Sequence, residues 1–413
     1  MFLGLICITG LSLISPIPED RKRKHDPGNF KCVKEASDDL YLFDKFTTLL
    51  HELLFLVQMK LEELGYNKTL EKFRTDNNLT GFDTGRIVAE HKERYVVLTE
   101  LGYFDAEITG NMRFTAKSRS DFPAVGDWVA VATFNSDFAV IHKIHPRSSV
   151  IKRQAAGQYV DIQIIATNID YAFIVQALDR DFNINRIERF LTICNSSGIR
   201  PIIILTKTDL LDMQQITEIT ADLKVRIKNV PVIAISNTTL EGFDNLKNII
   251  RKGKTYCLLG SSGAGKSSIL NNLSGRINMR TDAISSSTGK GKHVTSHREL
   301  FVLENGGILI DNPGMREVGI TDDGIGLEKT FDLIVTLATK CRFKDCSHTN
   351  ETGCHVIEAV ENGELARASY ENYLKMLKEK VYFDTTAAEK KRKERIFGKI
   401  IKNYKKSYGK DLQ

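Results

Sequence analysis

Cysteine is scarce in this sequence, and its distribution excludes one large class of protein. The 413 residues contain 7 cysteines. An odd number, with one tight cluster, does not fit a disulfide framework and instead indicates a metal site in a reducing compartment. The clustered residues are Cys341, Cys346 and Cys354, with His348 among them.

The N-terminus also lacks an apolar run that is long enough to cross a membrane. Residues 2–15 are mostly apolar but are too few for a membrane-spanning helix. Basic residues follow this run at 21–24, whereas a signal peptide carries its positive charge in front. We therefore interpret residues 1–58 as an extension that is disordered or not native, with an export or membrane signal as the alternative. The expected location is the cytoplasm, without a membrane partner.

Excess charge is small overall but concentrated at one end. The net charge is +6, which suggests a polyanionic partner. Residues 390–406 hold nine Lys or Arg and one acidic residue, interleaved with Ile and Phe. This pattern predicts a basic amphipathic helix that binds RNA phosphates, lies on an anionic membrane, or is merely solvated.

The pattern of residue types changes along the chain and predicts several regions, without an internal repeat. Residues 59–84 form a helical lead-in, with helical periodicity over 59–75. Residues 85–148 carry short strands and turns, typical of a small β-barrel of the oligonucleotide-binding (OB) kind or of a plain packing domain. The strands are expected at 94–98, 106–114, 126–132 and 138–142.

Residues 149–325 change to buried strands that alternate with helices, which predicts an α/β domain with a parallel sheet covered on both faces. Residues 326–413 are expected to form a helical metal-binding domain that ends in the basic tail. The strands of the α/β domain are expected at 171–178, 201–205, 231–236, 255–259 and 307–310, with helices at 184–196 and 213–228.

One segment carries a complete phosphate-binding motif. Residues 260–267 read GSSGAGKS, follow an apolar strand and precede a helix, which is the context that the motif requires. The backbone N–H groups would wrap the phosphates, Lys266 would reach the β and γ phosphates, and Ser267 would coordinate Mg²⁺. A chance Gly/Ser loop is the alternative. The expected nucleotide-binding residues here are Gly260, Ser261, Ser262, Gly263, Ala264, Gly265, Lys266, Ser267 and Ser268.

A second motif bears on the choice of base. Thr206, Lys207, Thr208 and Asp209 follow the strand expected at 201–205. The Asp209 carboxylate could accept both N1–H and N2–H₂ of guanine, which adenine does not offer, and Lys207 could lie along the base. Ser236 and Asn237 end the next strand and could support them. The alternative is a solvated turn with Asp209 as a helix cap.

Two further segments suit the magnesium side of a GTP site. Asp311 and Gly314 belong to DNPG, directly after the strand at 307–310. Asp311 would hold Mg²⁺ through water, and the Gly314 N–H would meet the γ-phosphate. Thr295 ends the flexible segment GKGKHVT and could complete the Mg²⁺ shell when GTP is present.

The residue that orients the attacking water is not the usual one. Many GTPases place a Gln directly after the Gly of the last motif, and this chain has Met315 there. His293 is the nearest suitable candidate for the catalytic role, because imidazole can accept a proton near neutral pH. The alternative is that His293 is an exposed loop residue.

The cysteine cluster has the composition of a closed zinc site. Cys341, Cys346, His348 and Cys354 offer three thiolates and one imidazole, enough for one structural tetrahedral Zn²⁺ without an open position. Reduced structural cysteines are the alternative.

The order of these motifs is unusual, because the base motif precedes the phosphate loop. A circular permutation of the same sheet explains this order. TKTD, GSSGAGKS, GKGKHVT and DNPG in that order, with CRFKDCSHTNETGC at 341–354, resemble the circularly permuted GTPases of small ribosomal subunit biogenesis, the RsgA or YjeQ family. The resemblance covers residue 59 to the C-terminus. Thr206 stands where GTPases generally have Asn.

The resemblance implies an OB barrel, a permuted GTPase domain and a zinc domain. It also implies GTP hydrolysis to GDP and phosphate, stimulated by the small ribosomal subunit, and a role in late subunit maturation. The expected partners are that subunit and its rRNA, with the chain as a monomer. Two other functions stay open: a nucleic-acid-binding module with a merely sensing nucleotide site, and a P-loop ATPase.

Overall fold

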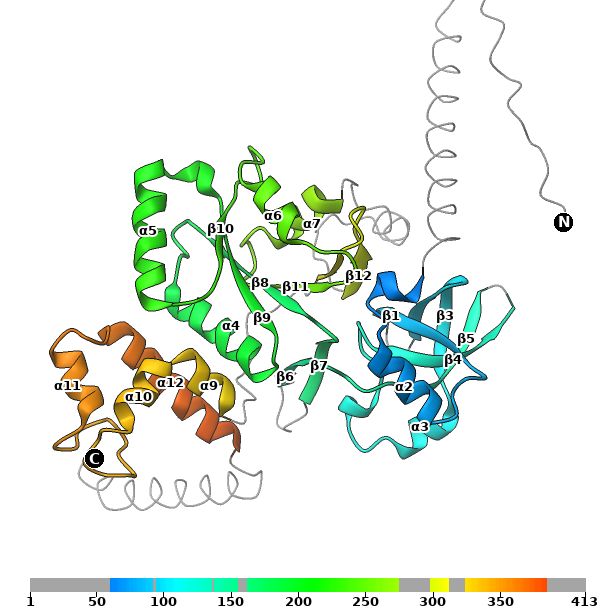
Figure 1. Ribbon diagram of the computed structural model, residues 1–413, viewed down its shortest axis with the longest axis horizontal. Coiled ribbons are helices and arrows are strands. Elements are labelled where there is room, and N and C mark those ends of the chain that lie inside the picture. Colours follow the sequence, from blue (N-terminus) through cyan, green and yellow to red (C-terminus); the bar gives the residue numbers. More distant parts are fainter. Residues whose placement is uncertain are drawn as a thin grey trace, which may run out of the picture. The chain divides into compact units, whose positions relative to one another are not determined.

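A computed structural model describes residues 60–91, 94–135, 137–154, 162–274, 298–311 and 324–384 (Figure 1). All of the described residues belong to one compact unit of the chain. The extension expected at 1–58 and the basic helix expected at 390–406 lie outside the described residues.

The helical lead-in consists of two short helices within the residues where helical periodicity was expected. A 3₁₀ helix, η1 (Leu61–Leu64), stops at Gly65, whose φ of 90° lies in the left-handed region. Helix α2 (Lys68–Asp76) then starts afresh, because the Asn67 side chain accepts two backbone N–H groups and caps it.

Five strands close into the expected OB-like barrel. The order is β1-β2-β3-β5-β4, with β4 pairing back onto β1 and β3 running parallel to β5. Because the sheet closes on itself, the barrel core is surrounded by strands. The strands are β1 (Asp83–His91), β2 (Arg94–Thr99), β3 (Gly102–Ile108), β4 (Trp128–Phe134) and β5 (Phe138–Ile144).

Two details of the barrel differ from the expectation. The strand predicted over 106–114 is wrong, because β3 ends at Ile108 and the Thr109 side chain caps helix α3 (Gly110–Thr115). A 3₁₀ helix, η2 (Arg119–Asp121), follows. Strand β1 was not predicted, since it contains a charge, Arg86, that is 1% exposed and donates to three backbone carbonyls.

The central sheet has six strands in the order β10-β9-β8-β11-β13-β12. All neighbours are parallel except β12, which runs antiparallel to β13, so the expected all-parallel sheet is corrected to a mixed one. A single residue pair, Ala89 with Glu299, joins β1 to β12. The strands are β8 (Tyr171–Ala177), β9 (Arg200–Thr206), β10 (Val232–Ala234), β11 (Thr255–Leu259), β12 (Glu299–Val302) and β13 (Ile308–Asp311).

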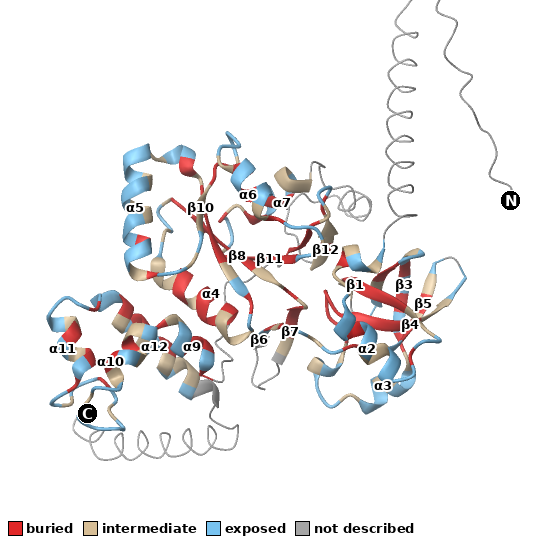
Figure 2. Cartoon of the chain, viewed as in Figure 1, coloured by how far each residue is buried: buried red, intermediate tan, exposed pale blue. Residues whose placement is uncertain are grey.

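Helices cover both faces of this sheet, as expected for buried strands (Figure 2). Neighbouring residues of β8 show this, because Ile174 belongs to the core under α4 and α5, and Phe173 to the core under α6 and α7. A hairpin, β6 (Val150–Gln154) with β7 (Ile162–Thr167), precedes the sheet. The helices are α4 (Ile184–Ser196), η3 (Thr208–Leu210), α5 (Met213–Arg226), α6 (Phe243–Ile249) and α7 (Lys266–Ser274).

The last described region is helical, with its own small core. It comprises α9 (Ile325–Thr330), α10 (Asp332–Ala338), α11 (His355–Glu361) and α12 (Arg367–Asp384). None of the helices in the described ranges is long and apolar enough to cross a membrane.

Candidate functional site

Four neighbouring strands of the central sheet end at the same edge, and a polar segment follows or ends each of them. Asp179 comes after β8, Lys207 after β9 and Gly260 after β11, while Asp311 is the last residue of β13. Ligands of open α/β sheets bind at the carboxyl ends of the strands. This edge is therefore the candidate nucleotide site.

The phosphate loop, residues 260–267, needs its glycines for close approach. A Cβ on Gly260 would lie 2.3 Å from the carbonyl oxygen of Val175, and a Cβ on Gly265 would lie 2.6 Å from Asn237 Nδ2. Lys266 begins α7, and its Nζ donates to the carbonyl oxygens of Gly260 at 2.8 Å and Ser261 at 2.7 Å. The ammonium group thus sits inside the curl of the loop, and its predicted contact with the β and γ phosphates stays a prediction.

The base segment, residues 206–209, contacts the phosphate loop directly. The buried Thr206 hydroxyl donates to the carbonyl oxygen of Ala264 at 2.7 Å. Lys207 takes a left-handed conformation, with φ 61°, and Thr208 and Asp209 open the short helix η3. The Ser236 hydroxyl donates to Asp209 Oδ1 at 2.6 Å, so the carboxylate is held in place from the segment that follows the neighbouring strand β10.

Two more residues of this edge support the site, and one of them, Asp179, was not predicted from the sequence. Asn237, which follows Ser236, donates through Nδ2 to the carbonyl oxygen of Gly265 at 3.4 Å. Asp179 Oδ2 accepts from Lys207 Nζ at 2.6 Å, and this hydrogen bond lowers the pKa of Asp179 and keeps it ionised. Asp179 was detectable, because it directly follows the apolar run at 171–178 just as Lys207 follows the run at 201–205.

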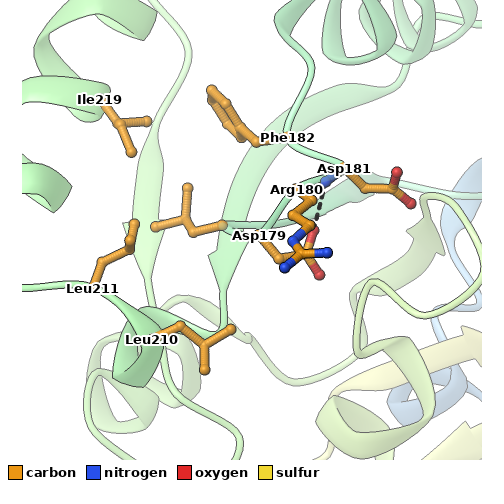
Figure 3. A pocket seen from close by; sticks show the side chains of 8 residues that line it. Asp179, Arg180, Asp181, Phe182, Leu210, Leu211 and Ile219 are labelled. Atoms are coloured by element: carbon orange, nitrogen blue, oxygen red, sulfur yellow. Dashed lines mark hydrogen bonds between the residues drawn. The ribbon is translucent and has the colours of Figure 1, made fainter.

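A cavity of about 690 Å³ lies beside this ion pair (Figure 3). Its lining is largely apolar with a charged rim, and it contains none of residues 206–209. The cavity is therefore a neighbour of the base segment and is distinct from it. The lining residues are Leu178, Asp179, Arg180, Asp181, Phe182, Leu210, Leu211 and Ile219.

The magnesium side of the site is described only in part. Asp311 is 3% exposed, and its strand β13 lies beside β11, the strand that leads into the phosphate loop. Ser267 is exposed at the start of α7. Gly314, Thr295 and His293 lie outside the described residues, so their predicted roles stay predictions.

The structure brings the four predicted metal ligands together. The ligand atoms of Cys341, Cys346, His348 and Cys354 all lie within 4.8 Å of one another. His348 Nδ1 is 3.6 Å from Cys341 Sγ and 3.4 Å from Cys354 Sγ, and the two sulfurs are 3.9 Å apart. A tetrahedron with Zn–S arms of about 2.3 Å has edges of about 3.8 Å, so the donors fit a zinc ion. The Tyr370 hydroxyl donates to the His348 carbonyl oxygen at 2.5 Å and fixes this loop onto α12.

Known proteins are similar to this chain in sequence and in fold. The RsgA GTPase family model matches residues 144–321. Small ribosomal subunit biogenesis GTPase RsgA 1 of Bacteroides thetaiotaomicron is 38% identical over 344 residues, which is 83% of this chain and 96% of that protein. RsgA 2 of Lactiplantibacillus plantarum is 40% identical over 332 residues, 79% of this chain and 93% of that protein.

Two solved structures agree with the sequence matches. YjeQ from Thermotoga maritima superposes with a TM-score of 0.54 at 26% identity, covering 72% of this chain and 98% of that one. YloQ, a circularly permuted GTPase, superposes with a TM-score of 0.53 at 26% identity, covering 74% and 97%.

Proposed function

This chain belongs to the RsgA family of GTPases and is a GTP-hydrolysing enzyme, and from that premise we propose that it acts in biogenesis of the small ribosomal subunit. The subunit binds the protein through rRNA and stimulates GTP turnover during late maturation. The protein works in the cytoplasm as a monomer, without a membrane partner. The support is that relatives with this printed function align over nearly their whole length.

The single observation that carries the proposed site is the hydrogen bond from Thr206 to Ala264, which unites the base segment and the phosphate loop in one pocket edge. Asp209, held by Ser236, reads guanine, and Lys207 and Thr208 flank the base. The phosphate loop and Ser268 hold the phosphates, with Lys266 as their main cation. Bound Mg²⁺ neutralises phosphate charge, and the residues that would hold it are Ser267, Thr295 and, through water, Asp311, with the Gly314 N–H at the γ-phosphate.

His293 is the proposed water-positioning residue. An imidazole can orient water and take its proton near neutral pH, which a Met side chain at position 315 cannot do. His293→Ala should therefore lower kcat for GTP while leaving GTP affinity unchanged. Equal turnover in the variant and the wild type would remove His293 from the chemistry.

The Cys/His cluster is proposed to hold one structural Zn²⁺. Four donors already complete a tetrahedral shell, so no position remains for a substrate. The metal would stabilise the fold of the region around α10 to α12.

The barrel exposes side chains suited to contact with RNA. Phe114 is 91% exposed on α3, with Arg113 and Lys117 close in sequence, and Phe134 is 51% exposed at the end of β4. Exposed aromatic rings stack on unpaired bases, and the cations contact phosphates without reading sequence. This supports rRNA as the partner.

The test is hydrolysis of GTP and ATP by the full chain, with and without purified small ribosomal subunits. Strong stimulation of GTP turnover alone is the expected result, and Lys266→Ala should abolish it by removing the phosphate cation. GTP turnover that subunits leave unchanged would overturn the proposed partner. ATP turnover at a comparable rate would overturn the role of Asp209.

A further inference from the structure

Helix α4 carries an arginine that reaches the phosphate loop from outside the motif. Asn183 caps this helix, so Arg186 lies in its first turn, directly after the loop that follows β8. Arg186 Nη1 donates to Ser261 Oγ at 3.1 Å and to the carbonyl oxygen of Asp181 at 3.2 Å. The contact with Ser261 spans 75 residues of sequence, and no motif predicts it.

Arg186 differs from the other arginines around α4, because no acidic side chain in the described part of the chain pairs with it. Arg226 forms an ion pair with Glu188 at 2.6 Å, and Arg189 forms one with Glu379. Arg186 is half-buried, and within the described ranges both of its partners are neutral oxygens. A guanidinium has five N–H donors, and among the described residues only Nη1 of Arg186 is engaged, so its other donors can take an anion that arrives from solution.

Ser261 lies in the proposed phosphate loop, so the anion inferred here is a phosphate of the nucleotide. Its carbonyl oxygen accepts from Lys266 Nζ at 2.7 Å, and its hydroxyl accepts from Arg186. Two cations therefore hold the same residue of the phosphate loop. A guanidinium beside such a loop raises the local positive potential, and this favours the more highly charged of two phosphate ligands.

We propose that Arg186 is a positioning residue of the nucleotide site, which holds the phosphate loop through Ser261 and makes the site favour GTP over GDP. The inference rests on the proposed assignment of residues 260–267 as the phosphate site. Arg186 acts before hydrolysis, in the choice between triphosphate and diphosphate.

The test compares the affinities of the full chain for GTP and GDP by fluorescent nucleotide titration. Arg186→Gln should weaken GTP binding by about tenfold, as expected for loss of one hydrogen bond from a charged donor, and GDP binding by about threefold. Arg186→Lys keeps the positive charge but loses the planar guanidinium with its several N–H donors, so its GTP affinity should lie between that of the Gln variant and that of the wild type. Arg200→Gln is the matched control, because Arg200 is exposed at the start of β9, at the opposite edge of the sheet.

The pathway through Ser261 is tested by a double-mutant cycle. Ser261→Ala should cost GTP affinity on its own but add little in an Arg186→Gln background, since the hydrogen bond is already lost. Additive losses in the double variant would overturn the action through Ser261.

Two results would overturn the whole inference. One is wild-type GTP affinity in Arg186→Gln. The other is an equal loss of GTP and GDP affinity together with a lower Tm, which would make Arg186 purely structural. If Lys266→Ala binds GTP as the wild type does, the assignment of the phosphate site itself fails, and this outcome is distinct from both.

Discussion

The hydroxyl of Thr206 and the carbonyl oxygen of Ala264 lie 2.7 Å apart and form a buried hydrogen bond across 58 residues of sequence. Thr206 is fully buried and Ala264 is 3% exposed, so water cannot replace either partner. Around this bond, Asn237 also donates to the carbonyl oxygen of Gly265. The base segment and the phosphate loop are therefore mechanically one unit, although they belong to different motifs.

Thr206→Val should break this unit at almost constant side-chain volume. The buried carbonyl oxygen of Ala264 loses a donor, so we expect a fall of about 1–3 kcal/mol in the free energy of unfolding, together with weaker GTP binding. Denaturant unfolding and nucleotide titration measure the two effects. Thr206→Ser keeps the hydroxyl and serves as the control; a Val variant as stable as the Ser variant would contradict the role of the hydrogen bond.

Asp209→Ala should remove the preference for guanine over hypoxanthine. Inosine triphosphate lacks the 2-amino group, so a wild-type site that uses the Asp209 carboxylate should bind GTP about tenfold more tightly, the value of one charge-assisted hydrogen bond. In the Ala variant the two affinities should be equal. Ser236→Ala releases Asp209 Oδ1 and should lower the preference only in part. A preference that survives Asp209→Ala would place base recognition elsewhere.

The sequence predicted the parts of the fold that have strong local signals. Residues 171–178 and 201–205 are nearly unbroken apolar runs, and β8 and β9 lie there. Strand β1 was missed because its polar and apolar residues do not alternate, and Arg86 is buried only through carbonyls far along the chain. The strand predicted over 106–114 extended too far for a similar reason. Phe114 is a residue type typical of strands, and yet it is 91% exposed on a helix.

The candidate site also contains residues that local sequence signals identified and residues that they did not. The phosphate loop and the metal cluster are contiguous in sequence, so residue types and spacing pointed to Lys266 and Cys341 directly. Asp179 and Arg186 act through partners 28 and 75 residues away, and these partners become neighbours only when the sheet forms. No local pattern marks Arg186, because the information lies in the packing of α4 against the edge of the sheet, whereas the place of Asp179 after the apolar run at 171–178 was a signal.

Cys341→Ser should abolish metal binding by the C-terminal region. Four donors at tetrahedral spacing predict one zinc per chain in the purified wild-type protein, and loss of one thiolate should release it and lower the Tm. Elemental analysis and thermal unfolding check both parts. Cys194→Ala, which alters a buried cysteine of α4, should retain the zinc. A wild-type protein free of zinc would favour reduced structural cysteines.

His145 should make the stability of the barrel region depend on pH. Its ring nitrogens are buried without hydrogen-bond partners in the described part of the chain, and burial, with help from the Arg74 charge, lowers its pKa from 6.5 to about 4. Below about pH 6.5 the His145 imidazole binds a proton in the unfolded chain but stays neutral in the folded chain. The free energy of unfolding therefore falls as the pH drops towards 4. It does not fall further below that value on account of this group.

His145→Phe should remove this component of the pH dependence, because Phe73 already packs against the ring. Denaturant unfolding at pH 7 and pH 5 measures the difference, and His142→Phe, at an exposed position, is the control. If the wild type and the His145 variant lose the same stability between these two pH values, other groups account for acid sensitivity.

Glu379→Arg should loosen helix α12 from helix α4. Arg189 donates through both Nη atoms to the Glu379 carboxylate, and Glu188 of the same helix accepts from Ser369 at 3.1 Å. Reversal of the charge at 379 sets two guanidinium groups against each other, so amide exchange in α12 should become faster. Lys378→Glu reverses a neighbouring exposed charge and should leave the exchange unchanged.

The double reversal Arg189→Glu with Glu379→Arg decides whether the pair matters energetically. It restores opposite charges, so exchange in α12 should return most of the way to wild type, with a coupling energy of about 1 kcal/mol for a partly exposed pair. A double variant as loose as the single one would show that Ser369 and its neighbours hold α12 without the ion pair. Helix α4 also carries Arg186 at its first turn, so GTP affinity measured on the same variants shows whether docking of α12 affects the phosphate loop. A loss of affinity in Glu379→Arg that the double reversal restores means that the two contacts are coupled. Wild-type affinity in both variants means that α4 is rigid enough to isolate them.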